Sequence, residues 1–596
     1  MKYLYCLTLC AVLLMAALAP SSAAEFRAFW VDAWGSGFEN SSATTTMINY
    51  VASCKCNAVI VEVRKRGDAY YDSSYEPRGT NVTPAAGYDC LADIVTKGHN
   101  AGLEVHAWVV VYRVWTSTSA PPATSPNHVY NTHPEWFSLT SSGSKFDGSN
   151  NSFLDPGHPG VEDFLINVFK EIISDYNIDG ICLDYIRYAG TSWGYNATAV
   201  ARYNAEYGLS GNPSSSSTQW LNWRRDQVSN LVKRTYLEAK AIKPNIKVGA
   251  AVWNSSTTGK NSYLQDWDLW LTNHWLDYAS PMAYTTTNST FNSWVNSYYN
   301  QQHGRHIYPA QGSYMNTISN SMTQLNYIRS KPMPGSEPYS YRVTNSGTVN
   351  RTSFKNSLLA GPYASTQSVP TMSWISSPTL GMLKGMVRNS SGVAIYPATV
   401  TIQSKSTKNS GTGFYGFTDL STGAYTVTAT AAGYNPASAN VTITAGRVTT
   451  CNLTLTSGGG GGTEIIIDNT SGSFSCSSNW STGTSSTDKY GVDYRYRSTQ
   501  AVSDQATWTP NIGSSGTYAV YAWWPQGSNR SQSAPYTVYY SGGTTTVNCN
   551  QQINGGRWNL LTTQYFGTGT GYPTKLSCWT TTGYVVMADA IRWLKQ

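Results

Sequence analysis

The chain has 596 residues and a formal net charge of +7, which is small for this length, and its Lys and Arg residues are scattered. Because no basic stripe is present, a nucleic-acid partner is not expected. Only 12% of the residues are charged, whereas Tyr (42) and Trp (21) are abundant. Aromatic rings stack on the C–H faces of sugars, so this composition is typical of carbohydrate-binding surfaces, but many secreted β-rich proteins share it.

The N-terminal residues 1–24 predict a signal peptide. Lys2 supplies a positive start, residues 4–18 are almost wholly apolar, and the small residues 22–24 form a cleavage site before Glu25. No later segment approaches 18 consecutive apolar residues. We therefore expect a secreted chain without a transmembrane segment after cleavage.

Eight cysteines remain after this cleavage, and their spacing fits no zinc motif. Because export favours disulfides, one disulfide is expected among Cys476, Cys549 and Cys578. Cys182 lies in an apolar strand and is expected to be a buried thiol. The sequence also lacks a Gly-rich phosphate loop, an HExxH motif and a Gly-x-Ser-x-Gly motif, so no metal or cofactor is expected.

Residues 25–380 alternate short apolar runs with helical patterns. The predicted strands are 27–34, 58–63, 103–109, 180–185, 246–252, 278–283, 307–311 and 335–341. The clearest amphipathic helix covers residues 161–176. Eight strands, each followed by a helix, predict a (β/α)8 TIM barrel. The long connections 112–159 and 187–218 follow strand ends on the face where such barrels build their sites.

The rest of the chain predicts two all-β sandwich domains. Residues 381–456 and 464–596 carry alternating strand patterns with Gly/Ser turns, and residues 457–463 form a Gly-rich linker between them. The predicted fold class is therefore multidomain, a TIM barrel followed by two β-sandwiches.

Acidic residues at strand ends are the candidates for chemistry. Asp184 ends the fourth strand, and Arg187 follows it and would hold it ionised. Glu62 ends the second strand, and Asp32 ends the first. Glycoside hydrolysis needs two carboxyls, one to protonate the leaving oxygen and one to act as nucleophile or base. We predict Asp184 as the catalytic carboxylate, Glu62 as the general acid because its apolar strand should raise its pKa, and Asp32 as the rival of Glu62.

Other polar and aromatic residues near strand ends are expected to bind the substrate. An ion pair of Glu62 with Arg64 or Arg113 is the structural alternative to a catalytic Glu62. His106 also fits a core position, and Trp108 and Trp253 also fit barrel packing. The predicted substrate-binding residues are Arg64, Asp68, His106, Trp108, Arg113, Asp155, Arg187, Trp253, Tyr284 and Gln311.

Six ordered segments resemble the glycosyl-hydrolase-10-like family of bacterial exported proteins: 27–32, 62–71, 104–108, 154–157, 179–188, and 265–267 with 275–278. The resemblance implies a (β/α)8 glycosidase that acts on bacterial or environmental polysaccharides, peptidoglycan glycan strands among them. It aligns Asp155 and Asp184 with the acidic core of the family. The family pattern has Gln where this chain has Glu62, and two acids where it has Leu183 and Asp184.

The two sandwiches also resemble known families. Residues 382–456 resemble the carboxypeptidase-regulatory-like sandwich, usually a spacer, and 464–596 resemble the golvesin-type C-terminal domain found on polysaccharide-degrading enzymes. The latter resemblance implies attachment to a cell surface or polymer. The expected function is a secreted glycoside hydrolase of O-glycosyl bonds. The alternative is a non-catalytic glycan-binding envelope protein that keeps the barrel but has lost its acid pair.

Overall fold

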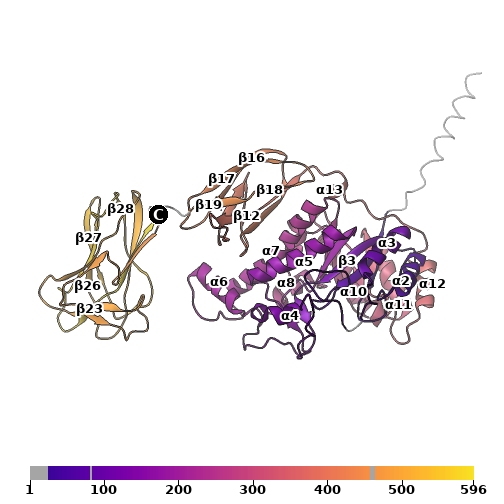
Figure 1. Cartoon of the computed structure of the whole chain (residues 1–596), viewed down its shortest axis with the longest axis horizontal. Coiled ribbons are helices and arrows are strands. Elements are labelled where there is room, and N and C mark those ends of the chain that lie inside the picture. Colours follow the sequence, from indigo (N-terminus) through magenta and orange to yellow (C-terminus); the bar gives the residue numbers. More distant parts are fainter. Residues whose placement is uncertain (1–23, 81–82, 457–463) are drawn as a thin grey trace, which may run out of the picture. The chain divides into compact units, whose positions relative to one another are not determined.

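A computed structural model describes residues 24–80, 83–456 and 464–596 (Figure 1). Apart from residue 24, the predicted signal peptide lies outside the described residues, and so does the predicted linker 457–463. One compact unit runs to residue 453 without residues 430–437, and a second comprises 430–437 and 454–596. In the described part of the chain, no helix is long and apolar enough to cross a membrane.

The N-terminal region confirms the predicted barrel, because eight parallel strands close on themselves. In order around the barrel they are β1 (Phe26–Val31), β2 (Ala58–Arg64), β3 (Glu104–Val110), β6 (Gly180–Asp184), β7 (Lys247–Val252), β8 (Tyr278–Ala283), the interrupted strand β9 (His306–Ile307) and β10 (Ala310–Gln311), and β11 (Gly335–Pro338). β10 pairs with β8 and β11, and β11 pairs with β1, which closes the ring. Each of the eight predicted strands is present.

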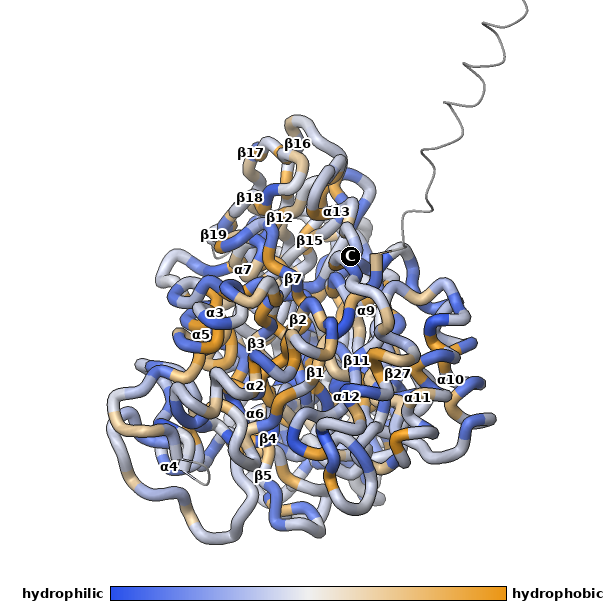
Figure 2. The backbone as a smooth tube through the Cα atoms, turned by 90° about the vertical axis from the view of Figure 1, so that its right-hand side faces the viewer, coloured by the Kyte–Doolittle hydropathy of each residue, from blue (hydrophilic) through white to orange (hydrophobic). Residues whose placement is uncertain are grey.

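Helices cover the outside of the barrel. They include α2 (Ser41–Ser53), α3 (Cys90–Asn100), α5 (Pro159–Asp175), α6 (Ala197–Tyr207), α7 (Thr218–Ile242), α9 (Trp267–Thr272), α10 (Asn288–Asn300), α11 (Ile318–Arg329) and α12 (Arg351–Ala360). α5 begins at Pro159, where a missing N–H costs nothing, and the His158 side chain caps it by accepting from the amide of Gly160. Its predicted apolar face is buried, and Figure 2 shows such orange stretches along the barrel strands and on α5.

Strand alternation separates two apolar clusters. Inward-facing residues such as Trp30, Trp108 and Cys182 form one cluster inside the barrel. Outward-facing residues such as Phe29 and Leu183 pack under the helices in the other. Each fully buried side chain of this size contributes about 1.5–3 kcal/mol to folding. Cys182 is buried and free, as expected.

Two all-β regions follow. The first has β12 (Gly381–Asn389), β15 (Phe414–Leu420), β18 (Val448–Thr450) and β19 (Leu453–Leu455) in one sheet, and β13 (Thr399–Ile402), β14 (Lys405–Lys408), β16 (Gly423–Thr430) and β17 (Ala437–Ile443) in another. The second contains β20 (Glu464–Asp468), β21 (Phe474–Ser475), β22 (Ser481–Gly483), β23 (Tyr494–Ser498), β24 (Gln505–Trp508), β25 (Gly516–Trp523), β26 (Ala534–Tyr540), β27 (Gly543–Cys549), β28 (Asn559–Phe566), β29 (Thr574–Ser577), β30 (Val585–Ala588) and β31 (Ala590–Lys595). These strands pair antiparallel in three sheets.

The first sandwich packs directly on the barrel helices. Arg234 of α7 forms ion pairs with Glu162 and Asp163 of α5, both at 2.7 Å, and donates to the hydroxyl of Thr412 at 3.1 Å. The ring of Phe414 is fully buried in the same cluster as the barrel helices. The sandwich residues up to 453, apart from 430–437, therefore share one compact unit with the barrel.

The predicted disulfide in the last region is wrong, since Cys476, Cys549 and Cys578 are all free. Cys549 ends β27 and Cys578 follows β29, and β26 lies between these two strands in the sheet. Two strand spacings of about 4.8 Å exceed the Cα separation of about 7 Å that a disulfide tolerates. The Sγ of Cys578 faces the carbonyl oxygen of Val502 instead, at 3.3 Å.

Candidate active site

A pocket of about 190 Å³ lies at the carboxyl ends of the barrel strands. This is the face on which (β/α)8 proteins build their sites, because the loops there can vary without disturbing the barrel. Both Glu62 and Asp184 reach it. Its lining residues are Trp30, Trp34, Glu62, Trp108, Arg113, Asp184, Tyr185, Arg187, Ala251, Met282, Tyr284 and Tyr339.

Asp184, the last residue of β6, accepts hydrogen bonds through both of its carboxyl oxygens. Its Oδ2 accepts from the indole N–H of Trp108 at 3.1 Å, and its Oδ1 accepts from the amide of Tyr185 at 2.6 Å. The guanidinium of Arg187 is 3.8 Å from Oδ1. Two hydrogen-bond donors and one guanidinium thus surround this carboxyl.

Tyr185 departs from the expected alternation. Its backbone φ of 49° is in the left-handed region, which non-glycine residues seldom adopt and which often marks functional positions. The strand pattern predicts Tyr185 on the face opposite Asp184. Because the chain turns out of the strand at this residue, Tyr185 instead lines the pocket beside Asp184.

Glu62 provides the second carboxyl of the pocket, and its environment differs from that of Asp184. It is fully buried, its Oε2 accepts from the amide of Ala33 at 2.9 Å, and its Oε1 has no hydrogen-bond partner among the described residues. Burial raises the pKa of Glu62 to about 8, although the Ala33 amide and the charge of Arg113 act in the opposite direction. The carboxyl of Glu62 is therefore mostly protonated at neutral pH.

Two arginines flank the ring of Tyr185. The guanidinium carbons of Arg113 and Arg187 lie 4.0 Å and 4.3 Å from its centroid, and Arg113 also donates to its hydroxyl at 2.8 Å. The Nε of Arg113 and one terminal nitrogen of Arg187 are buried without a hydrogen-bond partner in the described part of the chain.

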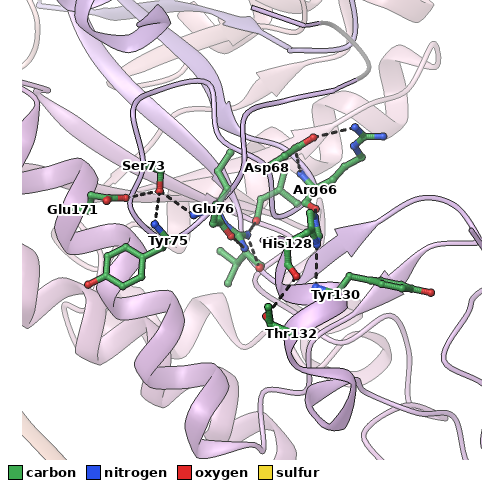
Figure 3. A network of polar contacts seen from close by, with 12 residues as sticks. Arg66, Asp68, Ser73, Tyr75, Glu76, His128, Tyr130, Thr132 and Glu171 are labelled. Carbon is green, nitrogen blue, oxygen red and sulfur yellow. Dashed lines mark hydrogen bonds and ion pairs between the residues drawn. The ribbon is translucent and has the colours of Figure 1, made fainter. Parts of the chain in front are cut away.

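Two of the predicted site residues carry other partners. Arg64 binds Glu76 through several hydrogen bonds, the shortest at 2.6 Å, and donates to the carbonyl of Val111 at 2.9 Å. A Glu62–Arg64 pair, the structural alternative to a catalytic Glu62, is therefore absent from the described ion pairs. Asp68 binds Arg66 at 2.9 Å in the loop after β2, in the polar network of Figure 3. Neither Arg64 nor Asp68 lines the pocket.

Asp32, the rival acid, is also held away from the pocket lining. The Nε of Arg342 lies 2.6 Å from its Oδ1, which also accepts from the amide of Trp34 at 3.0 Å. Arg342 lies 310 residues further along the chain, so this pairing has no local signal in the sequence.

Three further predicted residues lie apart from the pocket lining. His106 is fully buried toward the start of β3, where Nδ1 contacts the hydroxyl of Tyr278 at 2.8 Å. Gln311 donates to Gln324 at 2.7 Å, and Asp155 accepts from the amide of Gly157 at 2.8 Å. Burial raises the pKa of Asp155 to about 6.

Trp253 stands just outside the lining. Its ring centroid is 4.1 Å from that of Tyr263, and the guanidinium of Arg187 is 5.6 Å from the ring centroid of Trp253.

Of the predicted site residues, the structure thus brings six together at one pocket: Glu62, Asp184, Trp108, Arg113, Arg187 and Tyr284.

The sequence interpretation missed Tyr185, Met282, Tyr339 and the buried Glu337. Tyr339 follows β11 and lines the pocket, and an aromatic residue at the end of the eighth strand could have signalled it. Glu337 lies within β11, inside the barrel, and burial raises its pKa to about 8. Within the described residues, no group of three or more His, Cys, Asp or Glu could hold a metal ion.

Closed (β/α)8 barrels support many chemistries at this face, and two carboxyls at one mouth are the groups that glycoside hydrolysis requires. Residues 25–321 match the family described as Glycosyl hydrolase-like 10, residues 382–456 the Carboxypeptidase regulatory-like domain, and residues 465–595 the Golvesin C-terminal domain. The expected resemblance to these three families, in this order, is confirmed.

Several curated proteins are similar to this chain. Glycosyl hydrolase YngK of Bacillus subtilis (strain 168) is 27% identical over 369 residues, which cover 55% of this chain and 68% of YngK. Glycosyl hydrolase DigH of Escherichia coli (strain K12) is 29% identical over 259 residues, 38% of this chain and about half (54%) of DigH. Xanthan lyase of Bacillus sp. (strain GL1) is 31% identical over 136 residues, 22% of this chain and 14% of the lyase. The family and the first two relatives support a glycosidase-like activity.

Proposed function

We propose that this chain is a glycoside hydrolase that cleaves O-glycosidic bonds of a polysaccharide with Asp184 and Glu62 as its carboxyl pair. The observation that carries the proposal is one pocket that contains two carboxyls in different environments. Glu62 has its pKa raised to about 8 by burial, and Asp184 is surrounded by donors. Pairs of acids whose environments differ in this way divide the roles of acid and nucleophile or base.

The chemistry follows from these two environments. Glu62 gives its proton to the glycosidic oxygen as the bond to the anomeric carbon breaks. Asp184 either attacks that carbon or takes a proton from the attacking water, and Arg187 and the Trp108 indole N–H hold its carboxyl group in place. The rings of Trp34 and Tyr339 supply flat faces on which sugar rings stack.

The substrate we propose is a bacterial or environmental polysaccharide, such as a peptidoglycan glycan or an exopolysaccharide. The names of the relatives, two glycosyl hydrolases and a xanthan lyase, support a polysaccharide. We also propose that residues 1–24 direct secretion and that the golvesin-type region attaches the protein to a polymer or cell surface. The match to that region supports an extracellular protein.

The test is a screen of the full chain on a glycan array and on bacterial cell-wall and exopolysaccharides, with release of reducing ends as the readout. The proposal predicts new reducing ends from at least one polymer that the array shows to bind. Binding without release across the whole panel would contradict it and would favour the non-catalytic glycan-binding alternative.

A further inference from the structure

Another buried carboxyl lies inside the barrel, next to a residue of the pocket wall. Glu337 of β11 is fully buried, and its Oε2 accepts from the indole N–H of Trp30 at 2.9 Å. Its Oε1 accepts from the hydroxyl of Ser280 at 3.1 Å. Glu337 forms no ion pair with any of the described residues, so this carboxyl has no cation among them to balance it. It does not line the pocket.

Trp30 links this carboxyl to the candidate catalytic residue. Its ring lines the pocket and meets the ring of Trp108 edge-on, with centroids 5.0 Å apart and planes at 84°. The indole N–H of Trp108 in turn donates to Asp184 at 3.1 Å. Each side chain in the series from Glu337 to Asp184 thus touches the next one.

Stability alone does not explain a carboxyl at this position. Burying an acid without a cation is unfavourable, and an apolar side chain of similar volume is often equal or better there. What an apolar side chain cannot do is accept the indole N–H of Trp30. The hydrogen bond fixes the rotation of that ring, and tightly packed interiors transmit such constraints.

We propose that Glu337 is a positioning residue of the active site, which orients Trp30 and, through Trp108, the carboxylate of Asp184. The inference rests on the proposed function only for its effect on turnover. The contacts that define it lie within the barrel and do not depend on the substrate.

The first experiment is a double-mutant cycle in the full chain, with Glu337→Leu, Trp30→Phe and their combination. Trp30→Phe keeps a ring but removes the N–H that Glu337 accepts. Each single change should lower kcat roughly 10- to 100-fold with a smaller change in KM, since small misplacements of reacting groups cost up to about 100-fold. The double variant should be no slower than the slower single one, because both remove the same hydrogen bond.

Two matched variants separate positioning from a general effect on folding. Glu337→Gln keeps a hydrogen-bond acceptor for Trp30 and should retain turnover within a few-fold. Ser280→Ala removes the other hydrogen bond to the same carboxyl, leaves Trp30 bound, and should also retain turnover. Normal turnover in Glu337→Leu, or losses that multiply in the double variant, would overturn the proposal.

A second readout does not need hydrolysis. In 15N-tryptophan-labelled protein, the indole N–H resonance of Trp108 should move in Glu337→Leu and stay in place in Glu337→Gln, with assignments from single Trp→Phe variants. A Trp108 resonance unmoved by Glu337→Leu would overturn the positioning role. If the parent hydrolyses no glycan, the proposed function fails, whereas this spectroscopic result still decides the role of Glu337.

Discussion

The indole of Trp108 stands between the two carboxyls of the site. Trp108 is the register partner of Glu62 on the neighbouring strand β2, and its N–H donates to Oδ2 of Asp184 on β6 at 3.1 Å. Alternate strands of a barrel supply the same layer of its interior, so β2 and β6 can aim side chains into one space with β3 between them. The arrangement brings the fully buried carboxyl of Glu62 and the hydrogen-bonded carboxyl of Asp184 to one pocket of about 190 Å³.

Glu62→Gln should abolish proton donation and spare the rest of the site. We expect turnover on a native glycan to fall roughly 100- to 10,000-fold, the usual contribution of a general acid. Aryl glycosides whose phenol leaves without protonation should lose far less. The measurement compares kcat of parent and variant on both substrate types. Equal losses on both would show that Glu62 is not the general acid.

The activity should fall as pH rises through about 8, because Glu62 must carry its proton to act. The charge of Arg113 lowers the pKa of Glu62, so Arg113→Met should raise that pKa and move the alkaline limb to higher pH. The profile of kcat/KM against pH tests this for parent and variant. Arg64→Met serves as the control, since Arg64 binds Glu76. An alkaline limb that moves to lower pH in Arg113→Met would contradict the assignment of Glu62.

The buried carboxyl of Glu337 should make stability depend on pH. Its pKa rises from 4.5 in the unfolded chain to about 8 in the folded protein, so between these values the folded state binds the extra proton. The contribution of this group to stability therefore falls as pH rises from about 4.5 to about 8. The Glu337→Gln variant lacks this titrating carboxyl, so its stability lacks this contribution to the pH dependence.

The melting temperature of Glu337→Gln minus that of the parent should accordingly grow by a few degrees from about pH 5 to about pH 8. Calorimetry at both pH values measures the difference, with Glu104→Gln as a control, because the pKa of Glu104 is lowered to about 2 by His106 and Lys247 in spite of its burial. A difference that is constant with pH would mean that Glu337 is ionised in the folded protein.

The first sandwich should be needed for barrel stability. A chain ending near residue 379 loses the Thr412 partner of Arg234 and exposes the helix surface that Phe414 covers. We expect its melting temperature to fall by several degrees, because several contacts are lost together and each lost kcal/mol costs a barrel of this size roughly 1–2 °C. A chain ending within 457–463 keeps these contacts and is the control. Equal melting temperatures for the two would show that the sandwich is only a spacer between the barrel and the golvesin-type region.

The barrel and part of its site could be predicted from the sequence, because strand periodicity and strand ends are local properties. That reasoning placed Asp184, Glu62 and Trp108 at one mouth. Alternation indicates which side chains face the barrel interior, but not how far along the barrel axis they lie. We therefore predicted His106 and Gln311 at the mouth, although they do not line the pocket.

Other parts of the site depend on interactions that no local pattern encodes. Arg342 binds Asp32 across 310 residues, and the left-handed backbone of Tyr185 turns its ring into the pocket. Glu337 sits in a four-residue strand that also contains Gly335, Ser336 and Pro338, too short and too irregular for a periodic signal.

The most direct test of the proposed mechanism is the turnover of Asp184→Asn on the best polysaccharide from the screen, measured beside its affinity and melting temperature. Asp179→Asn is the control, since Asp179 precedes the same strand at its opposite end and binds the amide of Val105. We predict that Asp184→Asn loses turnover by about 1,000-fold or more while it still folds and binds the glycan. Turnover within a few-fold of the parent would place the chemistry on another residue and contradict the central claim.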